Sequence, residues 1–386
     1  MSRETDVQLV SEGQEQLPET TVIPVCRPLL PDVDRLSPYL RRIDSNRVYS
    51  NWGPLVTEFQ TRLASHFGRP DGSVVSAASG TAALVGGILA VAGRATIERP
   101  LALIPAFTFV ATALAAEACG YRPCFVDVNP DNWLLDADLL ERHPMLDSSG
   151  VVIPVAAFGR GVDQQPWVRF QHKTGIPVLI DGGASFEAVT SAPDRHLGAI
   201  PVTLSFHATK SFSTGEGGCV IAEDAVRAAS ILTALNFGFF ESRDCGSAAI
   251  NGKMSEYHAA VGLAELDGWE SKHEALLSVA SAYYHAFAAA NLADRLTGPP
   301  SVASCYSLFR CRTAEDAEER LSRLALANIE TRRWYGFGAH RHSGFASLRP
   351  LQCEHAVRIA GCTIGLPVAS DLSPAAISRV ARAFVT

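Results

Sequence analysis

A lysine and an aspartate in this chain are placed to do chemistry on a ring-shaped cofactor. Lys210 follows an apolar run at residues 200–206 and precedes a glycine-rich turn at 215–218, and Asp181 closes a second apolar run at 176–180. A lysine amine can form a Schiff base with pyridoxal phosphate, and a carboxylate can keep the pyridine nitrogen protonated so that the ring withdraws electrons. The pair therefore indicates a pyridoxal-phosphate site.

Each of these two residues also has an ordinary explanation. Most lysines are solvated at the surface, and an aspartate after a strand can simply cap the next turn or helix. Residues 200–206 and 219–222 are typical of two short buried strands, which puts Lys210 in a loop at a strand end. Because α/β proteins carry their chemistry on such loops, Asp181 and Lys210 can reach one cofactor from adjacent strand ends.

Two upstream segments add a phosphate site and a ring contact. Residues 76–84 are rich in Ser and Ala and open a small-residue helix that should run to about Ala92. Hydroxyls and free N–H groups at a helix start bind phosphate, although an ordinary Ser/Thr helix cap has the same sequence pattern. Residues 103–112 carry Phe107 and Phe109 two positions apart, so one ring can face the core and the other a ligand.

With these motifs in this order, the chain resembles the DegT-like (DegT/DnrJ/StrS type) sugar aminotransferases. Those are pyridoxal-phosphate enzymes of fold type I that act on nucleotide-linked keto-sugars. The resemblance runs from about Val22 to the C-terminus. The segments that carry it are residues 49–54 (YSNWGP), 79–81 (SGT), 105–112 (PAFTFVAT), 126–128 (VDV), 180–183 (IDGG), 205–210 (SFHATK), 236–238 (NFG), 251–256 (NGKMSE) and 365–368 (GLPV).

The resemblance implies roles for individual residues around the cofactor. It makes Lys210 the Schiff-base lysine, Asp181 the partner of the pyridine nitrogen and Phe109 the side chain stacked on the ring. The residues implied for the phosphate are Gly80, Thr81 and Ser205.

The resemblance also implies a homodimer with shared active sites. An asparagine from the partner subunit, Asn236 or Asn251 by motif position, would reach the phosphate. Glu216 in the Gly-Glu-Gly-Gly turn is a candidate for lining the sugar pocket. Arg332 and Arg333 could meet the diphosphate of a nucleotide sugar or be ordinary surface charges.

The chain departs from the family pattern at two positions. Ala184 stands three residues after Asp181, where the family commonly has a glutamine on the cofactor ring, so Ser185 or a water would replace that contact. Ala156 follows Pro154 and Val155, where the family has a histidine. Related dehydratases carry a histidine in place of the lysine, so the presence of Lys210 favours transamination.

The implied reaction has two halves. Glutamate or glutamine first gives its amino group to the cofactor, and the amino group then goes to C3 or C4 of a keto-sugar, with Lys210 as the proton shuttle. Two alternatives remain open: transamination of a cyclitol or other non-nucleotide ketone, and a non-catalytic regulator that keeps the cofactor. A nicotinamide-dependent oxidoreductase is disfavoured because no G-x-G-x-x-G motif follows a strand.

Composition agrees with an enzyme that acts on small molecules. The chain has 386 residues, 47% of them hydrophobic, and a net charge of −7, which argues against nucleic acid as a partner.

No run approaches the roughly 18 apolar residues of a membrane span, and the polar start lacks a signal-peptide pattern, so we expect a cytoplasmic protein. The nine cysteines show no repeated CxxC, and His340 and His342 have no nearby ligand partner in the sequence, so no metal site is expected.

The order of expected elements predicts an α/β fold in two domains. Residues 1–21 are predicted to be a flexible tail, and residues 22–260 a large cofactor-binding domain with a mostly parallel sheet flanked by helices. Residues 261–386 would form a linking helix and a small α+β domain. The expected elements of this part are one long helix over 257–289, a strand at 307–311, and helices at 314–327 and 374–384.

Overall fold

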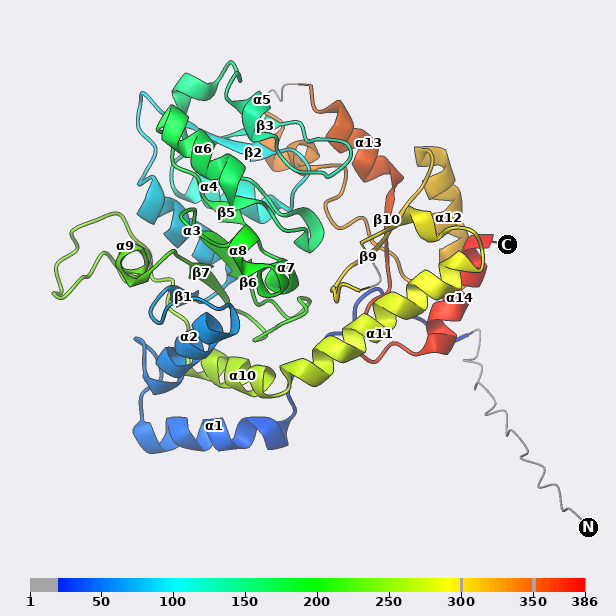
Figure 1. Ribbon diagram of the computed structural model, residues 1–386, viewed down its shortest axis with the longest axis horizontal. Helices are drawn as coiled ribbons and strands as arrows, with labels where there is room; N and C mark the ends of the chain where they lie inside the picture. The colour runs from blue at the N-terminus through cyan, green and yellow to red at the C-terminus, as the bar shows by residue number, and fades with distance from the viewer. Residues whose placement is uncertain (1–19, 299–300, 349–351, 386) are drawn as a thin grey trace, which may run out of the picture.

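The computed structural model describes residues 20–298, 301–348 and 352–385, so the predicted tail lies almost wholly outside the described residues. A large α/β part contains the first ten helices, and the long helix α11 leads away from it to a smaller part that contains α12 and α14 (Figure 1).

Two hydrogen-bonded sheets form the centre of the large part. The first has the order β3 (Arg122–Val126), β2 (Leu101–Pro105), β4 (Ser149–Val152), and all its pairings are parallel. The second has the order β1 (Val74–Ala77), β7 (Gly218–Ile221), β6 (Val202–Ser205), β5 (Ile180–Asp181). Parallel bridges from Val152 to Val178 and from Val155 to Asp181 join the two sheets.

Only β7 runs against its neighbours in this combined sheet, so the predicted mostly parallel arrangement is confirmed. The strands β1, β2, β4 and β7 are buried at every position, because helices cover both faces. Helix α3 (Gly80–Val91) packs on β6 and β7 and against α4 (Val110–Ala118) and α9 (Ala225–Leu235). The other helices of this part are α1 (Val33–Asn46), α2 (Pro54–His66), α5 (Ala137–Leu140), α6 (Gln164–Thr174), α7 (Phe186–Ser191) and α8 (Pro193–His196).

The prediction of one helix over residues 257–289 is wrong, because the chain forms two helices there. Helix α10 (Glu256–Asp267) ends at Gly268, and α11 (Trp269–Ala288) begins directly after it. The Arg35 guanidinium donates a hydrogen bond of 3.2 Å to the carbonyl oxygen of Ala264, and the N–H of Gly268 turns to Glu265 instead. A Cβ at position 268 would collide with that guanidinium, so a larger residue there would require the Arg35 side chain to move.

The smaller part is built on an antiparallel sheet of β8 (Leu296–Thr297), β9 (Ser307–Arg310) and β10 (Thr363–Leu366). Helices α12 (Ala314–Leu326), α13 (Glu354–Cys362) and α14 (Pro374–Val385) accompany it, so the predicted strand at 307–311 and helices at 314–327 and 374–384 are confirmed. The ring of Phe384 lies 5.1 Å from that of Phe287 and 4.6 Å from that of Phe309, which joins α11, β9 and α14 in one core. The domain boundary near residue 260, inside α10, stays a prediction.

Short 3₁₀ turns complete the described chain at Leu146–Ser148, Ala157–Gly159, Ala293–Arg295, Ala339–Arg341 and Ser343–Phe345. Across the described ranges, no helix has the length and apolar character needed to cross a bilayer.

Candidate active site

A cavity of about 420 Å³ lies where the carboxyl ends of β5 and β6 meet the starts of α3 and α4. Most of the residues predicted from the sequence line it. These are Gly80, Thr81, Phe109, Asp181, Ser205, Lys210, Glu216 and Arg332. The structure thus brings together side chains from segments that are far apart in the sequence.

Lys210 lies in the loop after β6, at the cavity wall. Its Nζ donates a hydrogen bond of 2.9 Å to the hydroxyl of Tyr306, which precedes β9. The chain has four lysines, and the other three pair with the side chains of Glu141, Asn251 and Glu265. Of the four, Lys210 alone lines this cavity, so it differs from an ordinary solvated surface lysine.

The Asp181 carboxyl is 8% exposed and is held by two hydrogen bonds. Oδ2 accepts from the hydroxyl of Thr112 at 2.7 Å, and Oδ1 accepts from the N–H of Gly183 at 3.0 Å. Burial raises the pKa of Asp181, while the bonds from Thr112 and Gly183 and the charge of Lys210 lower it less. The carboxyl therefore caps the turn at Gly183, which is the ordinary role of an aspartate after a strand. Asp181 also lines the cavity.

The N-terminus of α3 is held unusually close to β6. Ser79 caps the helix by accepting a hydrogen bond of 3.1 Å from the N–H of Ala82, so the capping expectation is confirmed. A Cβ on Gly80 would lie 2.6 Å from the Cβ of Ser205, and one on Gly218 would lie 2.9 Å from the backbone nitrogen of Gly80. These two glycines bring the first N–H groups of the helix beside the Ser205 hydroxyl.

The two phenylalanines that precede α4 divide as predicted. Phe107 is buried, with its ring 5.3 Å from that of Tyr335, whereas Phe109 is 55% exposed and lines the cavity. Phe109 occupies the N-cap position of α4 without a side-chain cap. The aromatic ring is thus available to a flat ligand.

Several cavity residues were missed by sequence reasoning. Tyr306 and Trp334 come from the C-terminal part, and their rings meet edge to face at 5.2 Å. His207 lies 3.8 Å from the Glu216 carboxyl. Thr112 is part of the 105–112 motif, but the motif did not indicate that its hydroxyl bonds to Asp181.

Three of the predicted residues do not line the cavity. Asn236 and Asn251 pair with each other across an antiparallel bridge. Arg333 lies 3.0 Å from the Glu318 carboxylate and donates to the carbonyl oxygen of Gly361, while Arg332 reaches the cavity and stacks over Trp334 at 4.9 Å. Arg333 thus forms structural contacts outside the cavity.

The two positions that depart from the family pattern both lie in the cavity wall. Ala156 and Ala184 both line it, where the family would place longer polar side chains. Ser185 is buried away from the cavity lining, and its hydroxyl has no hydrogen-bond partner among the described residues. Ser185 therefore does not replace the missing glutamine.

The donors and acceptors of the cavity match the groups of pyridoxal phosphate. Free N–H groups at the start of α3 and the hydroxyl of Ser205 suit the phosphate, the Asp181 carboxyl suits the pyridine nitrogen, and the Lys210 amine suits the carbonyl carbon. The described residues contain no group of three or more His, Cys, Asp or Glu side chains able to hold a metal ion.

Comparisons with known proteins give the same picture. The profile of the DegT/DnrJ/EryC1/StrS aminotransferase family matches residues 33–385. Protein Mb3436c of Mycobacterium bovis is 31% identical over 373 residues, which cover 94% of this chain and 89% of that protein. The dTDP-4-amino-4,6-dideoxy-D-glucose transaminase of Shigella dysenteriae is 30% identical over 63% of this chain and 64% of its own. The crystal structure of a candidate PLP-dependent aminotransferase from Bacillus cereus ATCC 10987 superposes with a TM-score of 0.84 at 26% identity, over 94% of this chain and all of that one.

Proposed function

The chain belongs to the DegT/DnrJ/EryC1/StrS aminotransferase family of fold-type-I, pyridoxal-phosphate-dependent enzymes, and we propose that it transfers an amino group from glutamate or glutamine to a nucleotide-linked keto-sugar. One observation carries the proposal. A single cavity presents the amine of Lys210, the carboxyl of Asp181 and the N-terminus of α3. When bound, pyridoxal phosphate supplies the electron-withdrawing ring that carries the amino group between the two half-reactions.

Lys210 is the proposed base and acid of both half-reactions. Lys210 would hold the cofactor through its amine, and the amine, once free, would be the basic group available to move a proton at the cofactor. The hydrogen bond from Nζ to the hydroxyl of Tyr306 gives the free amine a defined position. Lys210 can therefore remove a proton from one carbon and return it to the other.

The remaining cavity residues have the proposed task of holding the cofactor in one orientation. Asp181, fixed by Thr112 and Gly183, would hold the pyridine nitrogen. Phe109 covers the ring. The residues proposed for the phosphate are Gly80, Thr81 and Ser205, with Asn236 or Asn251 contributed by the partner subunit of a homodimer.

The acceptor is proposed from the charge at the cavity wall and from relatives. Arg332 lines the cavity and can meet a diphosphate, and Glu216 with His207 offers polar contacts to sugar hydroxyls. The Shigella relative is named for a dTDP-linked amino sugar. These features favour a nucleotide-linked keto-sugar aminated at C3 or C4. A cytoplasmic location remains part of the proposal.

The test supplies the holoenzyme with glutamate or glutamine and with dTDP-, UDP- and GDP-linked 3-keto and 4-keto sugars, and detects amino-sugar products by mass spectrometry. We expect one nucleotide sugar to be aminated by the wild type and none by Lys210→Ala. Amination of a free cyclic ketone alone would replace the proposed acceptor with a cyclitol or related ketone. Release of no keto acid from either donor would favour the non-catalytic regulator.

A further inference from the structure

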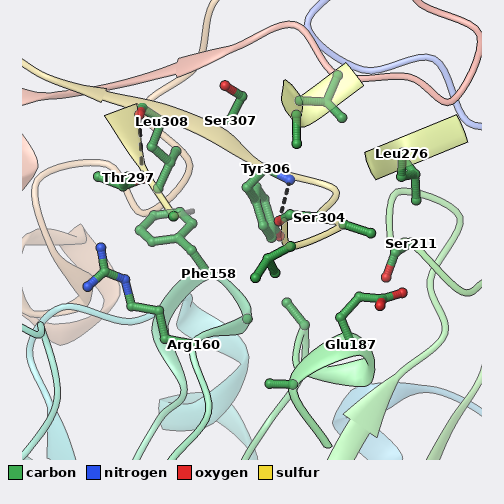
Figure 2. A pocket seen from close by; sticks show the side chains of 18 of the residues that line it. Phe158, Arg160, Glu187, Ser211, Leu276, Thr297, Ser304, Tyr306, Ser307 and Leu308 are labelled. Carbon is green, nitrogen blue, oxygen red and sulfur yellow. Dashed lines mark hydrogen bonds between the residues drawn. The ribbon is translucent and has the colours of Figure 1, made fainter. Parts of the chain in front are cut away.

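A second cavity, of about 250 Å³, lies beside the proposed cofactor site, and Figure 2 shows side chains that line it. It is enclosed by α7 of the large part and by α11, β8 and β9. Tyr306 and Ala184 line both cavities and so form part of the wall between them. Nothing in the aminotransferase chemistry proposed above uses this second space.

Most of the wall of the second cavity is apolar. Leu276 and Val279 of α11 and Leu308 of β9 are buried and face it from the C-terminal part, and Phe158 closes it from the large part. In Figure 2 the Phe158 and Tyr306 rings lie side by side in the view, and their centroids are 5.3 Å apart. Such a wall suits an aliphatic or aromatic body rather than a sugar.

One end of the cavity carries a buried carboxyl, that of Glu187 on α7. Glu187 is 8% exposed, and its Oε1 has no hydrogen-bond partner among the described residues. Its Oε2 lies 3.0 Å from Nε2 of His273, on the side of α11. Figure 2 shows the carboxyl pointing toward the Ser211 end of the cavity. An unpaired buried oxygen of this kind costs free energy, so the folded chain keeps a poorly solvated carboxyl group at this end of the cavity.

Arg160, the one guanidinium among the described residues that line this cavity, does not neutralise Glu187. Its guanidinium stacks over the ring of Trp133 at 4.1 Å and donates to the carbonyl oxygen of Asn132. In Figure 2 it is directed away from Glu187. Burial raises the pKa of Glu187 to about 7, so pH 8 favours its carboxylate form over pH 5.

We propose that this second cavity binds a small amphiphilic ammonium compound, with its apolar body between α11 and β9 and its N–H directed toward the carboxyl group of Glu187. A carboxylate at Glu187 attracts a positive charge in this cavity, whereas a carboxylate or phosphate in the same place would be repelled. The inference is independent of the acceptor sugar, because the ligand lies outside the cofactor cavity.

The probe for this site is N,N-dimethylhexylammonium, a tertiary amine that has one N–H and cannot form a Schiff base with the cofactor. Binding to the holoenzyme at pH 8 is measured by calorimetry and compared with hexanol and hexanoate, which share the aliphatic body. We expect the cation to bind at least tenfold more tightly than hexanol, and hexanoate not to bind. Equal affinity for the cation and hexanol would overturn the assignment.

Three variants locate the bound probe. Glu187→Gln should weaken the cation at least tenfold and leave hexanol unchanged, whereas Glu274→Gln, on the exposed side of α11, should change neither. Ala280→Leu adds bulk to the cavity wall and should weaken both compounds. Unchanged cation binding in Glu187→Gln, or unchanged binding of both compounds in Ala280→Leu, would show that the probe lies elsewhere and contradict the proposal. Glu187→Gln is expected to keep its aminotransfer activity, since Glu187 does not line the cofactor cavity.

Discussion

The hydroxyl of Thr112 donates a hydrogen bond of 2.7 Å to Oδ2 of Asp181, and this bond ties the first turns of α4 to the carboxyl end of β5. The same hydroxyl lies 2.9 Å from that of Thr108. Asp181 is therefore oriented by an element that also carries Phe109 at its start. The acid and the ring contact proposed for the cofactor are positioned together.

Asp181→Asn should reduce aminotransfer by about 10² or more, because an amide cannot hold the pyridine nitrogen in its protonated form. The same change should cost little stability, since burial already raises the pKa of this carboxyl and an amide carries no charge to bury. Steady-state kinetics and denaturant unfolding of the same preparation check the two effects. Equal losses of activity and stability would mean that Asp181 mainly caps its turn. Thr112→Val, which removes the orienting bond together with the contact to the Thr108 hydroxyl, should give an intermediate loss of activity.

Tyr306→Phe should slow the half-reaction with the amino donor by about tenfold, the usual worth of one hydrogen bond to a charged group. The ring contacts with Phe158 and Trp334 would remain, so the fold should be preserved. Stopped-flow measurement with glutamate or glutamine gives the rate. Tyr335→Phe is the matched control, because its hydroxyl also lies at the cofactor cavity but accepts a bond from the N–H of Phe158. A larger effect at Tyr335 than at Tyr306 would contradict the positioning of Lys210 by Tyr306.

Gly80→Ala should weaken binding of pyridoxal phosphate and leave binding of pyridoxal, which lacks the phosphate, nearly unchanged. The added Cβ would lie 2.6 Å from the Cβ of Ser205 and push the start of α3 away from β6. Fluorescence titration of the cofactor-free protein with both compounds measures the difference. Gly246→Ala is the control, because its Cβ would enter open space. Parallel losses for both compounds would argue that the phosphate does not bind at the start of α3.

Glu187→Gln should stabilise the protein at pH 8 and lose most of that advantage by pH 5. The pKa of Glu187 is raised from 4.5 to about 7 in the folded protein. The folded state therefore binds the proton more tightly than the unfolded state does. This contribution to stability is fully present below pH 4.5 and is lost as pH rises through 7. The difference at pH 8 can reach about 3 kcal/mol, with each pKa unit worth about 1.4 kcal/mol. Thermal unfolding at both pH values tests it, with the exposed Glu274→Gln as control. An unchanged or lower melting temperature for Glu187→Gln at pH 8 would contradict the burial of a charged carboxyl.

Local sequence was enough to find the residues that follow strand ends. Asp181 comes directly after an apolar run, Lys210 follows another by four residues, and Gly80 opens a helix after β1, so their neighbours in sequence indicate their place in the fold. Tyr306 could not be found in this way, because it is 96 residues from Lys210 and only the packing of the smaller part brings it to the amine. The break at Gly268 depends likewise on Arg35, a residue from α1.

The second cavity shows the same limit of local patterns. Glu187 occupies a polar position in a short helix, and its sequence neighbours do not indicate burial. Its environment is created by Leu276 and Val279 of α11, which arrive from beyond Gly268. Buried charge is a tertiary property, so only the folded chain reveals it.

The central claim is that Lys210 carries the cofactor, and borohydride reduction of the holoenzyme tests it most directly. Reduction converts the bond between lysine and cofactor to a stable amine, and peptide mass spectrometry then identifies the modified residue. The chain offers four candidates, Lys173, Lys210, Lys253 and Lys272. The account predicts modification of Lys210 alone, and modification of another lysine, or of none, would contradict it.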